Sequence, residues 1–127
     1  MAAAPVFTVT PRIGAVSIAT ADSSYTAPTN VGTVLTGAST GTRVNEICIK
    51  SAATSAAAVV RIFLYDGTTY WLFDELSVTA ATGSSTVPQF RTRVTYDNLV
   101  LPSASWSVRV TTSVSQATHV TAFGADL

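Results

Sequence analysis

Apolar and polar residues alternate along most of this chain, in short runs separated by clusters of Ser, Thr, Gly, Asn and Pro. A repeat of two residues is typical of a β-strand with one buried face, and turn residues at such short intervals indicate an all-β domain. Nine strands are predicted, at 6–9, 13–19, 31–35, 43–50, 58–65, 69–78, 87–96, 105–112 and 118–124. This pattern predicts an all-β fold, a two-sheet antiparallel β-sandwich that is jelly-roll-like.

The domain organisation is expected to be simple, because 127 residues is close to the common size of one domain. Residues 1–12 are predicted to form an extended N-terminal arm, and 13–127 a single sandwich domain. Two further segments are predicted to be loops. In SAATSAAAVV (51–60) the hydroxyl and β-branched residues oppose a helix, and in ADSSYTAPTN (21–30) a proline does.

The stretch RIFLYDGTTYWLFDEL (61–76) predicts a β-hairpin that turns at the dipeptide DG (66–67). A two-residue turn would place Tyr65 opposite Thr68, and a four-residue loop would place it opposite Tyr70. The two registers differ by an even number, so both sort the side chains onto the same faces. Only a three-residue loop or a bulge would break this sorting.

The two faces of the hairpin have different predicted roles. The face predicted to join the core is uninterrupted and apolar: Val60, Ile62, Leu64, Trp71 and Phe73. The other face is aromatic in the middle and would pair Arg61 with Asp74 at its end: Arg61, Phe63, Tyr65, Tyr70, Leu72 and Asp74. Either another part of the chain covers this second face, or it is a subunit or partner interface, where aromatic residues and arginine are enriched.

The composition favours a protein that packs against other proteins. Charged residues make up 11% of the chain, against about 25% in an average protein, and the formal net charge is zero. No excess of basic residues is present to neutralise phosphates, so no nucleic-acid partner is expected. Arg91 and Arg93 share one outward face and Arg109 is also outward, forming either a solvated face or a docking stripe for an acidic partner.

Residues that could carry catalysis are sparse. The single histidine, His119, has no acid beside it, and the single cysteine, Cys48, is expected to pack as a small apolar residue. One Cys and one His cannot supply a tetrahedral zinc site. Asp74 and Glu75 are adjacent in a strand, so their side chains point to opposite faces and cannot flank one bond. We therefore expect no enzymatic activity, cofactor, metal or small-molecule substrate.

The start of the chain, MAAAPVFTVTPR, has no basic region and only a short apolar run, and no apolar stretch reaches 18 residues. These features predict synthesis in a cytoplasm and no membrane partner. Trp106 opens a predicted strand, and an exposed tryptophan there would favour a glycan-binding module instead.

Four segments occur in an order that points to a family: GTRVNEICIK (41–50), AAAVVRIFLYDGTTYWLFDEL (56–76), LVLPSASWSVRV (99–110) and AFGADL (122–127). This order resembles small proteins encoded among the head genes of tailed bacteriophages. The resemblance covers about residues 32–127. The chain departs from the family pattern after its Leu-Pro pair, where Ser103 stands in place of the usual glycine.

The resemblance implies a virion component on the capsid surface, made in the host cytoplasm. It implies a capsid decoration (cement) protein that bridges subunits of the major capsid protein as a homo-oligomer, with a trimer favoured. The second face of the hairpin (Arg61 to Asp74, as given above) would then contact a sister subunit or the capsid. The N-terminal arm would add as a strand to a neighbour. The alternative is a glycan-binding or adhesion module of a phage tail or fibre.

Overall fold

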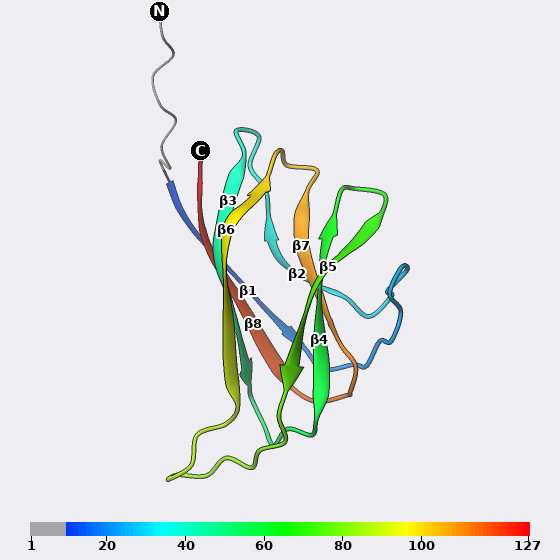
Figure 1. Cartoon of the computed structure of the whole chain (residues 1–127), viewed down its shortest axis with the longest axis vertical. Coiled ribbons are helices and arrows are strands. Elements are labelled where there is room, and N and C mark those ends of the chain that lie inside the picture. Colours follow the sequence, from blue (N-terminus) through cyan, green and yellow to red (C-terminus); the bar gives the residue numbers. More distant parts are fainter. Residues whose placement is uncertain (1–9) are drawn as a thin grey trace, which may run out of the picture.

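The computed structural model describes residues 10–127, which fold as two packed β-sheets (Figure 1). The described strands are β1 (Thr10–Ile18), β2 (Gly32–Thr36), β3 (Thr42–Ser51), β4 (Ala58–Tyr65), β5 (Tyr70–Val78), β6 (Arg91–Leu101), β7 (Ser107–Thr112) and β8 (Thr118–Asp126). Sheet A has the strand order β1-β8-β3-β6 and sheet B the order β2-β7-β4-β5. All neighbouring strands within the sheets are antiparallel.

The strand order is that of a jelly roll. Strands β1, β3, β6 and β8 lie in sheet A, and the strands between them in sequence lie in sheet B. The chain therefore crosses from one sheet to the other at every connection except the β4–β5 hairpin. Eight strands in two four-stranded antiparallel sheets confirm the predicted β-sandwich.

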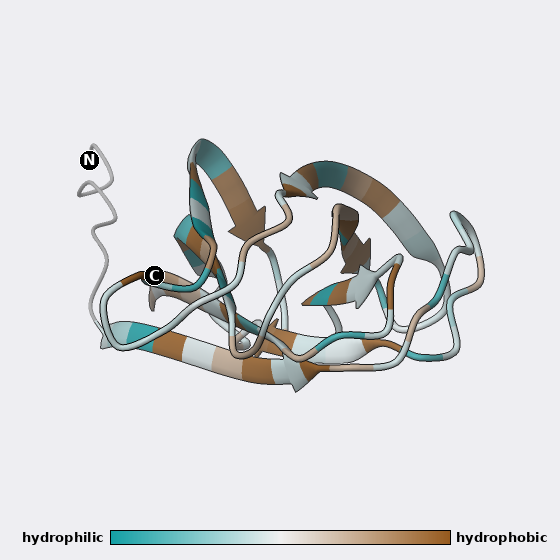
Figure 2. Cartoon of the chain, turned by 90° about the horizontal axis from the view of Figure 1, so that it is seen from below, coloured by the Kyte–Doolittle hydropathy of each residue, from teal (hydrophilic) through white to brown (hydrophobic). Residues whose placement is uncertain are grey.

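The core lies between the sheets and follows the predicted alternation (Figure 2). Apolar positions repeat every second residue on the inner faces because successive side chains of a strand point to opposite faces. The largest fully buried aliphatic side chains come from both sheets: Val44, Ile47, Ile49, Leu101 and Val120 from sheet A, and Val60, Ile62, Val108 and Val110 from sheet B.

The predicted strands agree with the structure to within a few residues, with one clear shift. Strand β4 has the predicted bounds, whereas the strand predicted at 87–96 lies at Arg91–Leu101. The prediction started too early because residues 87–90 belong to a loop, in which Val87 donates to the hydroxyl of Ser84. It ended too early because the chain is irregular after Tyr96 but continues as strand to Leu101.

The strand predicted at 6–9 lies outside the described residues, as does most of the predicted arm. Strand β1 nevertheless begins at Thr10, three residues before the predicted domain boundary. The reason is that Arg12 is fixed to the sandwich. Its guanidinium pairs with Asp126 at 2.9 Å and donates to the backbone carbonyl of Thr36 at 3.0 Å.

Both segments predicted to be loops are non-helical. Residues 52–57 and 19–31 contain only turns, bends and single bridges, at Ser55 and Ala21. Residues 10–127 contain no helix of a length and hydropathy that could cross a membrane.

The two lateral edges of the sandwich are closed to different extents. On the β1–β2 side the backbones touch: a Cβ atom on Gly14 would lie 2.0 Å from the carbonyl oxygen of Val34. On the β5–β6 side the sheets meet through side chains. Tyr96 Oη donates to Asp74 Oδ2 at 2.8 Å, and the rings of Phe73 and Tyr96 are 5.2 Å apart. The β5–β6 edge is thus the more open of the two.

The close approach at Gly14 predicts that Gly14→Ala lowers the free energy of unfolding by about 1–3 kcal/mol, because the added methyl group forces the two backbones apart. Urea denaturation would measure the change. Ser17→Ala, at an exposed position of the same strand, serves as the control and is expected to change stability by less than about 0.5 kcal/mol. Equal midpoints for Gly14→Ala and the wild type would show that the β1–β2 edge accommodates the methyl group without loss of stability.

Candidate interaction surface

The β4–β5 hairpin turns through a four-residue loop that Asp66 organises. Its Oδ1 accepts the backbone N–H groups of Thr68 and Thr69, both at 2.8 Å, and its Oδ2 accepts Trp71 Nε1–H at 3.1 Å. These donors favour the charged carboxylate and hold the pKa of Asp66 well below its usual range. Gly67 has a positive φ of 104°, which an L-residue adopts only with strain. Tyr65 lies opposite Tyr70, as one of the two predicted registers requires.

A β-bulge in β5 breaks the predicted sorting of side chains. Phe63 is paired with Leu72, but its neighbour Ile62 is paired with Asp74. Phe73 is therefore an extra residue without a partner in β4. An extra residue reverses the alternation beyond it, so the residues before and after Phe73 follow different inside–outside patterns.

Two predictions about this hairpin are wrong. The bulge accounts for Phe73 and Arg61, whereas Trp71 keeps its predicted partner Leu64 and is exposed beside the turn. Trp71 and Phe73 were expected in the core, but they are 54% and 41% exposed at the edge of sheet B. Arg61 was expected opposite Asp74, but it pairs with Glu75, with Nε 3.0 Å from Oε1. Asp74 instead points between the sheets to Tyr96.

The aromatic residues on the outer face of sheet B form a cluster with an arginine of β7. Phe63 is fully buried, with the ring of Tyr70 edge-on at 5.9 Å. Tyr65 and Tyr70 have ring centroids 4.3 Å apart. The guanidinium of Arg109 lies 4.1 Å from the ring centroid of Tyr65 and donates to Tyr70 Oη at 2.9 Å. Arg109 therefore covers the aromatic rings, in a cation–π geometry.

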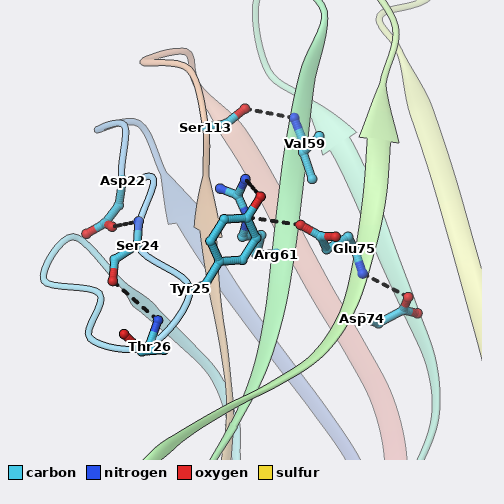
Figure 3. A network of polar contacts seen from close by, with 9 residues as sticks. All are labelled: Asp22, Ser24, Tyr25, Thr26, Val59, Arg61, Asp74, Glu75 and Ser113. Carbon is cyan, nitrogen blue, oxygen red and sulfur yellow. Dashed lines mark hydrogen bonds and ion pairs between the residues drawn. The ribbon is translucent and has the colours of Figure 1, made fainter.

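Arg61 is covered in a similar way by the β1–β2 loop, residues 19–31 (Figure 3). The Arg61 residue is only 7% exposed. Tyr25 lies over it, with the ring centroid 4.3 Å from the guanidinium carbon and the hydroxyl 3.1 Å from Nη2. Glu75 approaches from β5 on the other side.

The loop that carries Tyr25 is shaped by Asp22. The carboxylate of Asp22 accepts backbone N–H groups from Ser24, Thr29 and Asn30, at 2.9, 2.7 and 2.9 Å. These hydrogen bonds lower the pKa of Asp22, the one from Asn30 most strongly. A single aspartate thus closes both ends of the loop and positions the tyrosine above Arg61.

The structure separates the six residues predicted to form one interface. Arg61 and Phe63 are buried, and Tyr65, Tyr70 and Asp74 are half-buried by contacts within the chain. Leu72 is the exposed member of the set, at 40%. Much of the cover that the second face needs therefore comes from Tyr25 and Arg109.

Part of the exposed apolar surface lies along the β5–β6 edge, and another part is formed by Ile13 and Phe123, 67% and 40% exposed, which are paired in the β1–β8 ladder of sheet A. We call Trp71, Leu72, Phe73 and Val100 the edge patch; they are 54%, 40%, 41% and 42% exposed. A groove of about 370 Å³ adjoins the patch, lined by Leu64, Phe73, Tyr96, Asp97, Asn98, Leu99 and Val100. The sequence does contain one signal for this patch. Four consecutive large apolar residues (YWLF, 70–73) cannot all lie on one face of a regular strand.

The outer face of sheet A carries a second distinctive surface, which we call the basic face: Lys50, Arg91 and Arg93. Lys50 lies directly opposite Arg91 in the β3–β6 ladder, a pairing of like charges. Arg91 and Arg93 are exposed, and the nearest carboxylate oxygen to Arg93 belongs to Glu46, at 3.7 Å. Arg109 lies on sheet B, so the three arginines of the predicted docking stripe do not form one stripe.

The remaining candidate residues are placed as follows. His119 is exposed on sheet A, opposite Lys50 and Ser17. Cys48 is a half-buried free cysteine beside Arg91, and its sulfur raises the pKa of that arginine. Trp106 packs against the core. Within residues 10–127, no three His, Cys, Asp or Glu side chains are grouped so that they could hold a metal ion.

The fold and surface define this chain as an eight-stranded jelly-roll domain with an exposed aromatic edge. No family model and no curated protein matches the sequence. Among solved structures, it is similar to a chain in "Structure of infectious bursal disease virus Gx strain", with 14% identity and a TM-score of 0.38. The match covers 99% of this chain and 36% of that chain, so this chain spans little more than a third of its length. A likeness this distant carries no argument about function.

Packing, more than the ion pair, is expected to determine what Arg61 contributes to stability. Arg61→Ala removes the support of Tyr25 and is predicted to lower the free energy of unfolding by about 2–3 kcal/mol. Glu75→Gln removes only the charge of a side chain that is 43% exposed. It is predicted to cost less than about 1 kcal/mol. Denaturant midpoints of both variants test this, and equal losses would show that the ion pair dominates.

The lowered pKa of Asp66 predicts a loss of stability in acid. A carboxyl whose folded pKa is depressed stabilises the fold fully above its unfolded pKa, close to 3.8, and loses that contribution as the pH falls toward the folded value. The wild type is therefore expected to exceed Asp66→Asn in stability most at neutral pH, with the difference shrinking below about pH 4. Urea denaturation at several pH values measures it. A difference independent of pH would contradict the charge-based explanation, and Asp97→Asn, outside the turn, is the control.

Proposed function

We propose that this chain is a non-enzymatic structural protein of a virion, which decorates a tailed-phage capsid and stabilises it by bridging subunits of the major capsid protein. The observation that carries this proposal is the edge patch. Trp71 and Phe73 stay about half exposed at a sheet edge, although each aromatic side chain can bury about 150–250 Å². Contiguous apolar surface of this kind marks protein interaction sites.

The edge offers two kinds of contact to a partner. Strand β5 ends sheet B and strand β6 ends sheet A, so each presents backbone groups that no other strand within residues 10–127 pairs. An extended segment of a partner can add along such an edge by β-augmentation. The adjoining groove, lined by Leu64, Phe73 and Tyr96 among others, would receive an apolar side chain of that segment.

Other features agree with a role in a multi-subunit shell. The jelly roll is an architecture found in viral capsid domains, among others. The resemblance of residues 32–127 to phage head proteins points the same way. Only 11% of the residues are charged, which suits a chain that packs against other chains. Modest affinity at each site is sufficient, because an oligomer that engages several capsid subunits gains avidity from the high effective concentration.

A second function has one observation in its favour. Glycan-binding sandwiches stack sugars on exposed aromatic rings, and Trp71 is such a ring. Its Nε1–H is bonded to Asp66, which fixes the indole, while 54% of the residue remains exposed. The candidate for this role in the sequence, Trp106, packs against the core instead. A quench or shift of tryptophan fluorescence on adding host polysaccharide, abolished by Trp71→Phe, would favour this function.

The proposal predicts that Trp71→Ser combined with Phe73→Ser reduces the binding of this protein to phage heads by at least about tenfold, because two central aromatic contacts are lost. The measurement is the number of copies that cosediment with heads purified from a phage that lacks the gene. The control is Val87→Ser, which removes a side chain that is 51% exposed in the loop after β5. Its binding should equal that of the wild type.

Val87→Ser should keep the denaturation midpoint of the wild type. The double variant loses the contact of Phe73 with Tyr96 and should have a lower midpoint, but a cooperative transition would show that it folds. Wild-type protein that does not cosediment with heads would overturn the capsid role. Undiminished binding of the double variant would leave the capsid role intact and remove the edge patch from it.

A further inference from the structure

The charges of this chain are segregated, although they sum to zero. Seven basic and seven acidic residues are present, yet basic side chains gather where β3 pairs with the first residues of β6, with Glu46 beside Arg93, whereas Asp97 lies exposed further along β6. The basic face consists of Lys50, Arg91 and Arg93. Around the edge patch, Asp66, Asp74 and Glu75 are bonded to Trp71, Tyr96 and Arg61 of the same chain, and Asp97 is the carboxylate for which residues 10–127 show no such bond.

The basic face contains an unfavourable pairing of like charges. Lys50 and Arg91 occupy directly opposed positions in neighbouring strands, where like charges repel. Lys50 relieves part of this by donating to the backbone carbonyl of Gln89 at 2.8 Å. The guanidinium of Arg91 has no carboxylate within ion-pair distance in the described chain, and Arg93 reaches Glu46 only at 3.7 Å. An acidic surface placed on this face would neutralise the repulsion.

The acidic edge has the complementary chemistry. Asp97 is exposed at the rim of the groove, and Arg43 contacts its backbone carbonyl rather than its carboxylate. Phe73 lines the same groove, and Trp71 lies two residues before it in β5, with both residues about half exposed. Arginine binds such a surface in two ways at once, because its guanidinium pairs with carboxylates and stacks on aromatic faces. Lysine would supply only the charge.

We infer that the basic face of one copy of this chain docks on the acidic, aromatic edge of a second copy. In this contact Arg91 and Arg93 lie against Trp71, Phe73 and Asp97 of the next molecule. The inference deepens the proposed function, on which it rests for the expectation that copies assemble. It identifies the acidic partner of Arg91 and Arg93 as another molecule of the same protein.

The contact is head-to-tail when the face of one copy meets the edge of a second copy whose own face stays free for a third. Each copy contributes its basic face to one neighbour and its edge to another, and such heterologous contacts close into rings when the rotation permits. A symmetric edge-to-edge dimer is disfavoured, because it would bring Asp97 and Glu75 of one copy against the same carboxylates of the other. The favoured product is therefore a small ring, consistent with the trimer expected from the resemblance.

The size of the wild-type assembly and a mixing experiment together test this contact, because a symmetric face-to-edge contact stops at a dimer whereas a head-to-tail contact gives a larger ring. The face variant carries Arg91→Ser and Arg93→Ser, and the edge variant carries Trp71→Ser and Phe73→Ser. Light scattering after gel filtration should give a ring for the wild type and a monomer of 13.2 kDa for each variant alone. An equimolar mixture should give a heterodimer and nothing larger, because only one intact face and one intact edge can meet.

The controls concern folding and salt. Each variant should unfold cooperatively. The face variant is expected to match or exceed the wild-type midpoint because the repulsion between Lys50 and Arg91 is gone, and the edge variant is expected to fall below it because Phe73 no longer packs on Tyr96. The wild-type ring should have a higher dissociation constant in 1 M NaCl than in 0.1 M NaCl, since salt screens exposed charge pairs. Val87→Ser should form the wild-type ring.

Three results would overturn the inference: a monomeric wild type, a face variant that still forms the wild-type ring, or a mixture that contains only monomers. The first result, with wild-type protein still bound to phage heads, would leave the proposed function intact. A wild-type ring that passes the mixing test but does not bind heads would leave the contact intact and overturn the proposed function.

Discussion

The unpaired residue Phe73 in strand β5 is the constraint on which the surface of this protein depends. Because the chain gains one residue there, Glu75 turns outward to Arg61 and Asp74 turns inward to Tyr96. Before the bulge, the hydrogen bond to Asp66 holds Trp71 at the edge, beside the turn. A regular strand would have placed Phe73 opposite Ile62, on the inner face. The bulge instead leaves Phe73 exposed at the edge, next to Trp71 and Leu72, whose pairing it does not change.

The two lateral edges differ because backbone closes one of them and aromatic side chains close the other. At the β1–β2 edge the absence of a Cβ on Gly14 lets the two backbones meet, and no large side chain is needed to fill the space. At the β5–β6 edge the sheets are held apart by Phe73 and Tyr96, whose rings meet at 5.2 Å, and the groove beside them remains open. The sandwich is therefore sealed by backbone on one side and by aromatic residues on the other. Only the second kind of seal leaves surface for a partner.

Much of the fold was predictable from the sequence, because the local pattern of residue types determines where the strands lie and which faces they bury. Strand β4 has its predicted bounds, since Val, Ile and Phe favour a strand and alternation fixes their faces. The hairpin register was narrowed to two possibilities by the Asp-Gly turn. The bulge was not predictable, because no residue near Phe73 requires it. It arises from competition between pairing in sheet B and contact with Tyr96 in sheet A, 23 residues further on.

The covering of the outer face of sheet B was hidden from the sequence for a related reason. Tyr25 reaches Arg61 across 36 residues, and Arg109 reaches Tyr70 across 39. Both contacts exist only because the strand order places β7 beside β4 and leaves the β1–β2 loop folded over them. Local composition shows that an aromatic face needs cover. Only the topology shows which residues supply it.

The four edge strands of the two sheets show why β5 is the one expected to have a partner. Proteins protect exposed edges with proline, charge, bulges or short strands. Strand β1 carries Pro11 and lies against β2, strand β2 is only five residues long, and strand β6 carries Arg91 and Arg93. Strand β5 has its bulge, but it also exposes Trp71, Leu72 and Phe73 in succession. The bulge disrupts regular strand pairing at this edge, while the aromatic side chains stay exposed. Such an edge suits contact with one partner of complementary shape better than the addition of a strand from any protein.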